Sequence, residues 1–408
     1  MKMLVLGDPA TLLHNTVELL NGKSIPAYES PERLRTIIEA IISDGIHEYR
    51  EVGGSKSDHK TANPEGEVGT DASQLSRFVR ETHDAGYLKY LRTVHSEWVK
   101  LGLITEDEDV LPECYRLPSV ARAGSEPREP RDPSALSGYY SFDMSAGISR
   151  DSWTSIISSA GLAAEAVRAL FPSPDACPRK DVMALCRPPG HHCTTKMAGG
   201  YCYINNAVVA VQALRHFHKD ASGDDKQPPK VAILDIDFHH GNGTQDYFYH
   251  DPHVSYVSVH GEDQYPYYTG YEDETGAGDG ERSNWNLPLP VGSSAEEYME
   301  RLGEAVSILE NMRPQYMVVS LGFDTYHGDP LGYFGIQTED YARIARMIRG
   351  RACLEGVPAV ILLEGGYVVE ALGPNLLSFL RGWEDVGLAG TRRFSIPISR
   401  GVGARPSI

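Results

Sequence analysis

Short apolar runs alternate along the chain with longer segments whose apolar residues recur at helical spacing. The short runs predict strands at 1–7, 181–186, 231–234, 254–260, 316–322 and 359–363. The helical spacing predicts helices at 31–43, 72–85, 86–100, 152–170, 205–217, 295–312 and 338–355. Because strands and helices alternate, we expect an α/β fold: a parallel sheet flanked by helices on both faces.

Two segments carry no regular apolar period. Residues 53–71 are polar and rich in glycine, and a loop insertion at about 105–137 collects Pro, Arg and Glu. A loop of that length is usually functional or disordered, so we expect it near a functional site or a subunit interface. Neither an internal repeat nor a domain linker is visible, and the prediction is a single domain over residues 1–408.

The most informative stretch runs from Val231 to Gln245, where a buried strand ends in carboxylates, imidazoles and glycines. Side chains alternate on a strand, so Asp235, Asp237 and His239 share one face. Unpaired carboxylates are costly to bury, and a bound cation is the simplest remedy. The alternative is that the two aspartates cap the next helix and that His239 is a hydrogen-bonded core residue.

Polar motifs follow the carboxyl ends of four predicted strands. They lie at residues 187–192, 235–245, 324–329 and 364–367. Ligands bind at that edge of an open α/β sheet, so the four segments are expected to meet in one crevice. If they were unrelated caps and turns, their shared edge would be an accident.

Composition narrows the class of protein. A hydrophobic content of 41% and a charged content of 23% are typical of soluble globular proteins, and no apolar run is long enough to span a bilayer. The net charge of −18 argues against nucleic-acid binding and favours cationic small molecules or basic peptides. The cysteines are scattered without a C-x-x-C pair, and the first residues do not form a signal peptide, so we expect a cytoplasmic protein.

Five motifs together resemble the zinc-dependent histone deacetylase superfamily, which has the arginase-like α/β fold. They are R-P-P-G-H-H, G-G-Y-C-Y-I-N-N, D-I-D-F-H-H-G-N-G-T-Q-D, S-L-G-F-D-T-Y-H-G-D-P and E-G-G-Y. Within the superfamily the chain is most similar to the acetylpolyamine amidohydrolases, which also match at V-E-L-L-N-G, H-D-A-G-Y-L and G-Y-Y. The resemblance covers nearly the whole chain and implies a deacetylase acting on linear amides.

The resemblance implies one catalytic zinc ion per chain, with Asp237, His239 and Asp324 as ligands. Three N/O ligands leave a coordination position open, which is the mark of a catalytic zinc. Zinc in such a site lowers the pKa of water toward ~7 and polarises the amide carbonyl. The same ligands also suit iron or cobalt.

Three further residues match the family's catalytic groups. His191 and His192 match its tandem histidines, and by resemblance Asp235 orients the first and Asn242 the second. An imidazole paired with an amide keeps a lower pKa than one paired with a carboxylate, so His192 is predicted to be the general base. Tyr367 matches the catalytic tyrosine, whose phenol donates a hydrogen bond to the oxyanion.

A structural potassium ion beside the zinc is also implied by the resemblance. Its expected ligands are Asp235, Asp237 and backbone carbonyls near His239, Ser258 and Val259. Main-chain oxygens leave no pattern in a sequence, so this assignment depends on the resemblance alone.

The family's substrate tunnel has two aromatic walls. One falls at Gly200 and Tyr201, and the other at Tyr267, with Tyr268 as the alternative. Two such walls grip a thin aliphatic chain, which can belong to a polyamine or to an acetylated lysine. Discrimination between them is therefore expected at the rim of the tunnel.

Three rim positions bear on the substrate. Glu18 matches an acidic residue that acetylpolyamine amidohydrolases use near the cationic end of the substrate, whereas Ser134 stands where those enzymes have a second glutamate. Leu331 occupies the position that is glutamate in the eukaryotic polyamine-specific deacetylase. In the relatives the loop at about 122–137 helps to build a dimer that narrows the entrance, so a homodimer is expected.

The prediction is a zinc-dependent amidohydrolase that deacetylates N-acetylated polyamines or similar small acetylated amines. The alternative keeps the mechanism and takes acetyl-lysine in proteins, as histone deacetylases do. A dimetal ureohydrolase shares the fold but needs further carboxylates, which H-H-G-N-G does not supply. A non-catalytic reader of acylated lysine is disfavoured by the intact set of ligands, base and tyrosine.

Overall fold

An eight-stranded parallel sheet forms the centre of the molecule, with the strand order β4-β1-β5-β10-β9-β6-β7-β8. The computed structural model describes residues 2–52, 74–115, 128–172, 179–222, 227–351 and 354–389. The strands of the sheet are β1 (Leu4–Gly7), β4 (Glu48–Glu51), β5 (Asp181–Ala184), β6 (Val231–Asp235), β7 (Val254–Gly261), β8 (Asn284–Leu289), β9 (Tyr316–Leu321) and β10 (Ala359–Leu363). A separate antiparallel hairpin consists of β2 (Val17–Leu20) and β3 (Lys23–Pro26).

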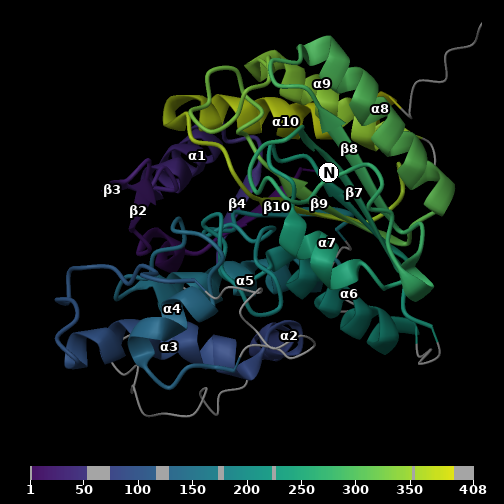
Figure 1. Cartoon of the computed structure of the whole chain (residues 1–408). Coiled ribbons are helices and arrows are strands. Elements are labelled where there is room, and N and C mark those ends of the chain that lie inside the picture. The colour runs from purple at the N-terminus through teal and green to yellow at the C-terminus, as the bar shows by residue number, and fades with distance from the viewer. Residues whose placement is uncertain are drawn as a thin grey trace, which may run out of the picture.

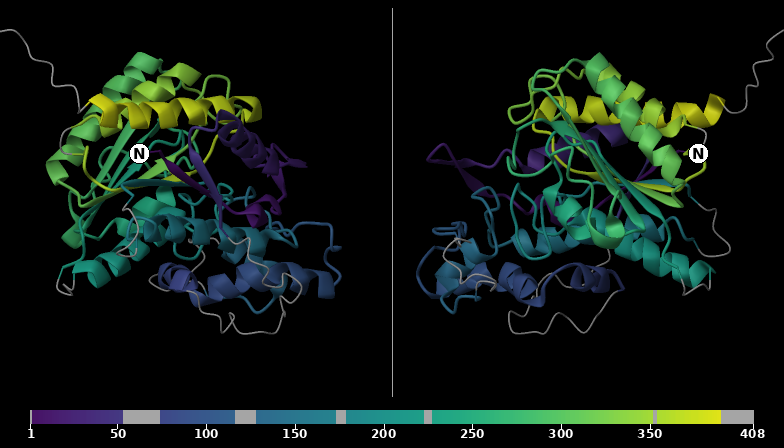
Figure 2. Two further views of the ribbon diagram at one scale, coloured as in Figure 1. Left: turned by 180° about the vertical axis from the view of Figure 1, so that it is seen from behind. Right: turned by 45° about the vertical axis from the view of Figure 1, so that its right-hand side comes forward.

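Helices cover both faces of the sheet (Figure 1). One layer contains α2 (Gln74–Thr82), α3 (Ala85–Lys100), α4 (Pro133–Tyr139), α5 (Ser152–Arg168) and α6 (Asn206–Ser222). The opposite layer contains α1 (Pro31–Asp44), α8 (Ala295–Met312), α9 (Thr338–Arg349) and α10 (Val369–Ala389). The short helix α7 (Asn242–Phe248) follows β6, and Figure 2 shows the two layers from two further directions.

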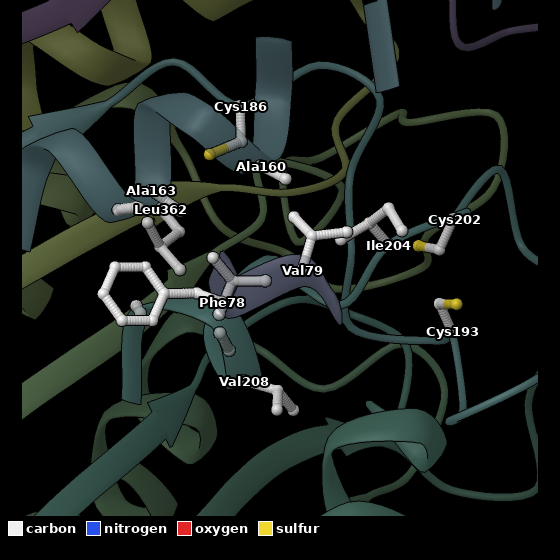
Figure 3. Close-up of a cluster of buried hydrophobic side chains, with 14 of the residues drawn as sticks. Phe78, Val79, Ala160, Ala163, Cys186, Cys193, Cys202, Ile204, Val208 and Leu362 are labelled. Carbon is white, nitrogen blue, oxygen red and sulfur yellow. The ribbon is translucent and has the colours of Figure 1, made fainter. Parts of the chain in front are cut away.

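Each helical layer closes a hydrophobic core on its own face of the sheet. On β10, Val360 and Leu362 belong to the core under α5 and α6, while Ile361 and Leu363 belong to the core under α8 to α10. Both faces of the strands are therefore apolar, which explains their unbroken hydrophobic runs. Figure 3 shows part of the core under α5 and α6, which includes Cys193, the residue after His192.

The predicted α/β architecture is confirmed, and the missed elements have recognisable causes. β8 reads N-W-N-L-P-L and α10 contains Pro374, so neither gives a clean apolar period. The predictions also missed β2, β3, β4, α4 and α7. The helix predicted at 338–355 ends at Arg349, and the loop at 53–71 lies outside the described residues. None of the described helices combines the length and apolar character that crossing a bilayer requires.

The topology brings the polar motifs together. The four strands that precede them, β5, β10, β9 and β6, are consecutive neighbours in the centre of the sheet. All are parallel, so their carboxyl ends open on one edge. The register pairs Asp235 at the end of β6 with Ser320 on β9 and with Ser258 on β7. Segments up to 180 residues apart in the chain thus meet at one edge of the sheet.

Candidate active site

The centre of the site contains Asp237, His239 and Asp324, all buried. Nδ1 of His239 lies 3.0 Å from Oδ2 of Asp324 and 3.3 Å from Oδ1 of Asp237. One potential ligand atom from each residue lies within 4.8 Å of the others. The structure therefore brings the three predicted zinc ligands together, and their N/O chemistry is that of catalytic zinc sites.

The electrostatics of this cluster fit a cation. Burial by itself lowers the pKa of His239, but hydrogen bonds with Asp237 and Asp324 raise it to about 10. Burial and the nearby carboxylate of Asp237 raise the pKa of Asp324 to about 7. A divalent cation held by these atoms compensates the buried carboxylates and replaces the proton that the histidine shares with them.

The tandem histidines have different partners, as predicted. Nδ1 of His191 lies 3.1 Å from Oδ2 of Asp235, and Nδ1 of His192 lies 2.8 Å from Oδ1 of Asn242. Burial lowers the pKa of His191, but the carboxylate of Asp235 more than offsets this and the pKa rises to about 10. Burial and the adjacent His191 hold the pKa of His192 well below its usual value. His192 is thus the neutral imidazole of the pair.

Tyr367 reaches the site through a turn that only glycine can make. Gly366 has φ of +112°, and a Cβ there would lie 2.6 Å from Cβ of Phe323. The backbone N–H of Tyr367 donates to Oδ2 of Asp329 at 2.7 Å. Burial raises the pKa of Tyr367 well above its usual value, so the phenol stays protonated and can donate a hydrogen bond.

Arg33 on α1 holds this turn in place, although it was not predicted. Its side chain is fully buried, and it donates from Nε to the carbonyl of Gly366 at 2.6 Å and from Nη2 to the carbonyl of Glu364 at 2.5 Å. Its Cζ lies 5.0 Å from the centre of the Tyr367 ring. The sequence does indicate a buried role for this arginine, because Arg33 lies on the apolar face of α1, four residues before Ile37.

Glu364, the first residue of the E-G-G-Y motif, joins this motif to R-P-P-G-H-H. Its carboxylate accepts hydrogen bonds from the backbone of Gly190 at 2.8 Å and from the hydroxyl of Ser320 at 2.9 Å. With His191 and Cys202 it forms a second group whose ligand atoms lie within 4.8 Å. Through these hydrogen bonds Glu364 connects the loop after β5 to the loop after β10.

The two tunnel walls differ from the prediction on one side. Tyr201 lies opposite Tyr367, with 5.7 Å between the ring centres, as expected for one wall. The ring that contacts the histidines on the other side is Tyr265, whose centre lies 5.0 Å from that of His192. Tyr267, the predicted wall, lies one ring farther out, 6.0 Å from Tyr265, and is 57% exposed. The segment Y-P-Y-Y contains three tyrosines, and spacing alone does not select among them.

Gly200 and Glu18 lie beside the first wall. A Cβ at Gly200 would come within 2.3 Å of Cδ2 of His192, so this backbone passes directly over the imidazole. Glu18 on β2 was expected at the rim, but its side chain is buried and accepts a hydrogen bond from the Tyr201 hydroxyl at 2.9 Å. The carboxylate therefore contacts the wall of the tunnel. Tyr268, the alternative for the second wall, is 84% exposed.

Leu331 and the expected potassium ligands lie around the centre. Leu331 is half-buried, and its N–H donates to Asp329, the residue that also holds Tyr367. For the potassium site, strand pairing places Ser258 beside Asp235, and Val259 follows on β7. The potassium ion itself stays a prediction.

Comparison with known proteins identifies the family of the chain. The model of the family described as "Histone deacetylase domain" matches residues 27–382. Acetylpolyamine amidohydrolase 2 of Pseudomonas aeruginosa is 33% identical over 384 residues, which is 94% of this chain and 98% of that protein. Acetylpolyamine amidohydrolase of Burkholderia pseudomallei is 38% identical over 307 residues, 75% of this chain and 82% of that protein.

A solved structure shows the same fold. The crystal structure of an acetylpolyamine aminohydrolase from Burkholderia pseudomallei superposes with a TM-score of 0.77 at 32% identity, covering 94% of this chain and 99% of the other. The family match spans more than half of the chain, and it includes the strands and loops that carry the site. This chain belongs to the histone deacetylase domain family.

Proposed function

We propose that this protein is a zinc-dependent amidohydrolase that removes the acetyl group from N-acetylated polyamines or similar small acetylated amines. The observation that carries the proposal is the juxtaposition of a buried Asp-His-Asp donor set, a neutral imidazole and a protonated phenol at one sheet edge. The relatives that match nearly the whole chain are named acetylpolyamine amidohydrolases.

The base in this reaction is His192. Its Nδ1–H donates to Oδ1 of Asn242, which leaves Nε2 unprotonated and able to take a proton from the attacking water. The same nitrogen then returns that proton to the leaving amine. Bound at Asp237, His239 and Asp324, zinc supplies a Lewis acid for the amide carbonyl and lowers the pKa of water.

Two other side chains complete the chemistry. The hydroxyl of Tyr367 donates a hydrogen bond to the oxygen that becomes negative as the amide is attacked. His191 is paired with Asp235 and carries a positive charge at neutral pH, because its pKa is about 10. That charge lies next to His192 and helps to keep the base neutral.

The tunnel favours a slim cationic substrate. Tyr201 and Tyr265 flank the route to His192, and aromatic walls of this kind accommodate an alkyl chain. The net charge of −18 attracts an amine that still carries a positive charge at its far end. Acetyl-lysine in a protein also fits such a tunnel, so protein deacetylation is the second candidate.

We also propose a structural potassium ion beside Asp235 and Asp237, a homodimer, and a cytoplasmic location. The potassium proposal is supported by the buried carboxylate of Asp235 at the end of β6, which lies beside Ser258 on β7. The cytoplasmic proposal is supported by Cys114, Cys186, Cys193 and Cys202, which are free thiols. The expected dimer loop at 122–137 lies partly outside the described residues.

Steady-state kinetics test the substrate. We expect kcat/KM to be at least about tenfold higher for N-acetylputrescine, N-acetylcadaverine or N-acetylspermidine than for an acetyl-lysine peptide, which corresponds to about 1.4 kcal/mol of transition-state binding. A tenfold preference for the peptide would replace the polyamine proposal by protein deacetylation. Failure to release acetate from any of these amides, with zinc bound, would remove the hydrolase proposal itself.

A further inference from the structure

A single carboxylate joins the two walls of the substrate tunnel. Oδ2 of Asp143 accepts a hydrogen bond from the hydroxyl of Tyr265 at 2.5 Å and another from the backbone N–H of Gly200 at 2.9 Å. Gly200 precedes Tyr201, so the two donors belong to opposite walls. Asp143 is half-buried and lies in neither of the loops that it connects.

The segment around Asp143 is itself held firmly. The N–H and hydroxyl of Ser145 both donate to the Asp143 carboxylate, at 3.1 Å and 2.8 Å. The Ser145 hydroxyl in turn accepts from the N–H of Tyr201 at 3.4 Å. The N–H of Phe142 donates to the carbonyl of Ala198 at 3.0 Å. The Asp143 carboxylate is therefore held in a fixed position relative to Gly200 and Tyr201.

Tyr265 depends on this fixed point more than Tyr201 does. Tyr265 belongs to the long loop after β7, and its hydroxyl is anchored by Asp143, while the Phe142 ring stacks on its ring at 6.4 Å with 24° between planes. With this anchor, the ring stands edge-on to His192, at 87° between planes. Release of the hydroxyl would let the second wall swing with its loop.

We propose that Asp143 is a positioning residue that sets the width of the tunnel, and thereby its preference for slim amines, by tying Tyr265 to the Gly200 wall. The proposal deepens the proposed function and rests on it for the identity of the substrate. Asp143 is acceptor-only, as its donors Tyr265, Gly200 and Ser145 require. Asparagine would turn an N–H₂ group toward at least one of them, so it cannot replace the carboxylate.

Two variants isolate the tether. Tyr265→Phe keeps the ring and removes the donor, and Asp143→Asn keeps the size and removes the charge. Tyr249→Phe and Asp279→Asn are matched controls, because they make the same chemical changes at the C-cap of α7 and at an exposed residue of the short 3-10 helix at 278–280. kcat and KM are measured for N-acetylputrescine, which is slim, and for N-acetylbenzylamine, which is wide, with zinc content determined for every sample.

The expected result is a loss of selectivity. Each of the two variants should raise KM for the slim amine and reduce the slim-to-wide ratio of kcat/KM by about tenfold, the factor that corresponds to the loss of a hydrogen bond to a charged acceptor. The loss should lie mainly in KM, with a smaller change in kcat for the slim amine. The double variant should lose no more than the stronger single one, because Asp143 acts through Tyr265.

Three results would overturn the proposal. The first is an unchanged slim-to-wide ratio of kcat/KM in both variants, and the second is a fall in that ratio of about a hundredfold in the double variant, as two independent effects would give. The third is a lower ratio in Asp143→Asn with no change in Tyr265→Phe. The last would mean that Asp143 contacts the substrate directly. If wild type hydrolyses neither amine, the proposed function fails, and crystal structures of wild type and Asp143→Asn decide the tether. A displaced Tyr265 ring in the variant supports it, and an unmoved ring refutes it.

Discussion

Replacing Asn242 by aspartate should raise the pKa of the general base, His192, and keep it protonated to a higher pH. Asn242 occupies the first turn of α7, where an acidic residue is tolerated and even favoured by the helix dipole. The new carboxylate would take the place of an amide oxygen that lies 2.8 Å from Nδ1 of His192. The substitution thus changes the charge of the partner while preserving its shape.

The neighbouring histidine shows the size of the effect. His191 is as deeply buried as His192, but its partner is a carboxylate at 3.1 Å and its pKa is about 10, whereas the pKa of His192 is far below 6.5. Two unit charges about 4 Å apart interact by about 4 kcal/mol at an effective dielectric constant of about 20, or about three pKa units. Asn242→Asp should raise the pKa of His192 by about that amount.

The sign of the pH effect follows directly. A histidine whose pKa is raised stays protonated to a higher pH and cannot accept a proton there. The acid limb of the kcat/KM profile for N-acetylputrescine should therefore move up by about two to three pH units, with activity recovering as the pH rises. At one unit below the new pKa, about a tenth of the neutral base remains.

The matched control is Asn242→Ala, which removes the orienting oxygen without adding a charge. It should lower activity at every pH and leave the acid limb where it is in wild type. An Asn242→Asp enzyme whose activity falls equally at all pH values would refute the reasoning, because the lost rate would then reflect orientation alone. Zinc content must match wild type in both variants.

Three further predictions concern the same site. Tyr367→Phe should reduce kcat by about 100- to 1,000-fold while zinc stays bound, as elemental analysis together with kinetics will show; retained activity contradicts the oxyanion role. Arg33→Lys should lower kcat about tenfold or more, because a single ammonium cannot reach the carbonyls of both Gly366 and Glu364; unchanged kinetics would show that the turn holds itself. Zinc affinity should rise between pH 6 and pH 8, because zinc displaces protons from Asp324 and His239, whose pKa values are raised to about 7 and about 10 in the metal-free chain. A titration with a competing chelator measures this, and a flat profile contradicts it.

Much of the fold could be read from the sequence because the sheet is buried on both faces. Strands such as β6 and β10 are continuous apolar runs, and they are followed at once by polar motifs. The edge strand β8 and the hairpin β2–β3 are mixed in polarity and short, so their patterns could not be separated from loops.

The centre of the site was predictable and its surroundings were not. Asp237 and His239 lie two residues apart at a strand end, a spacing that fixes their shared direction. Arg33 and Asp143 act across more than 50 residues of chain, through backbone carbonyls and a tyrosine hydroxyl that no local pattern encodes. Tyr265 was missed because neighbouring tyrosines in the same loop are equivalent in sequence and differ only in where the loop turns.

Reconstitution with metal tests the central claim most directly. Protein stripped of metal by a chelator should release no acetate from N-acetylputrescine, and activity should rise linearly with added zinc until one ion is bound per chain. Asp324→Asn should bind zinc far more weakly and stay inactive at the same zinc concentration. Full activity in stripped protein, or a requirement for two ions per chain, would contradict the account.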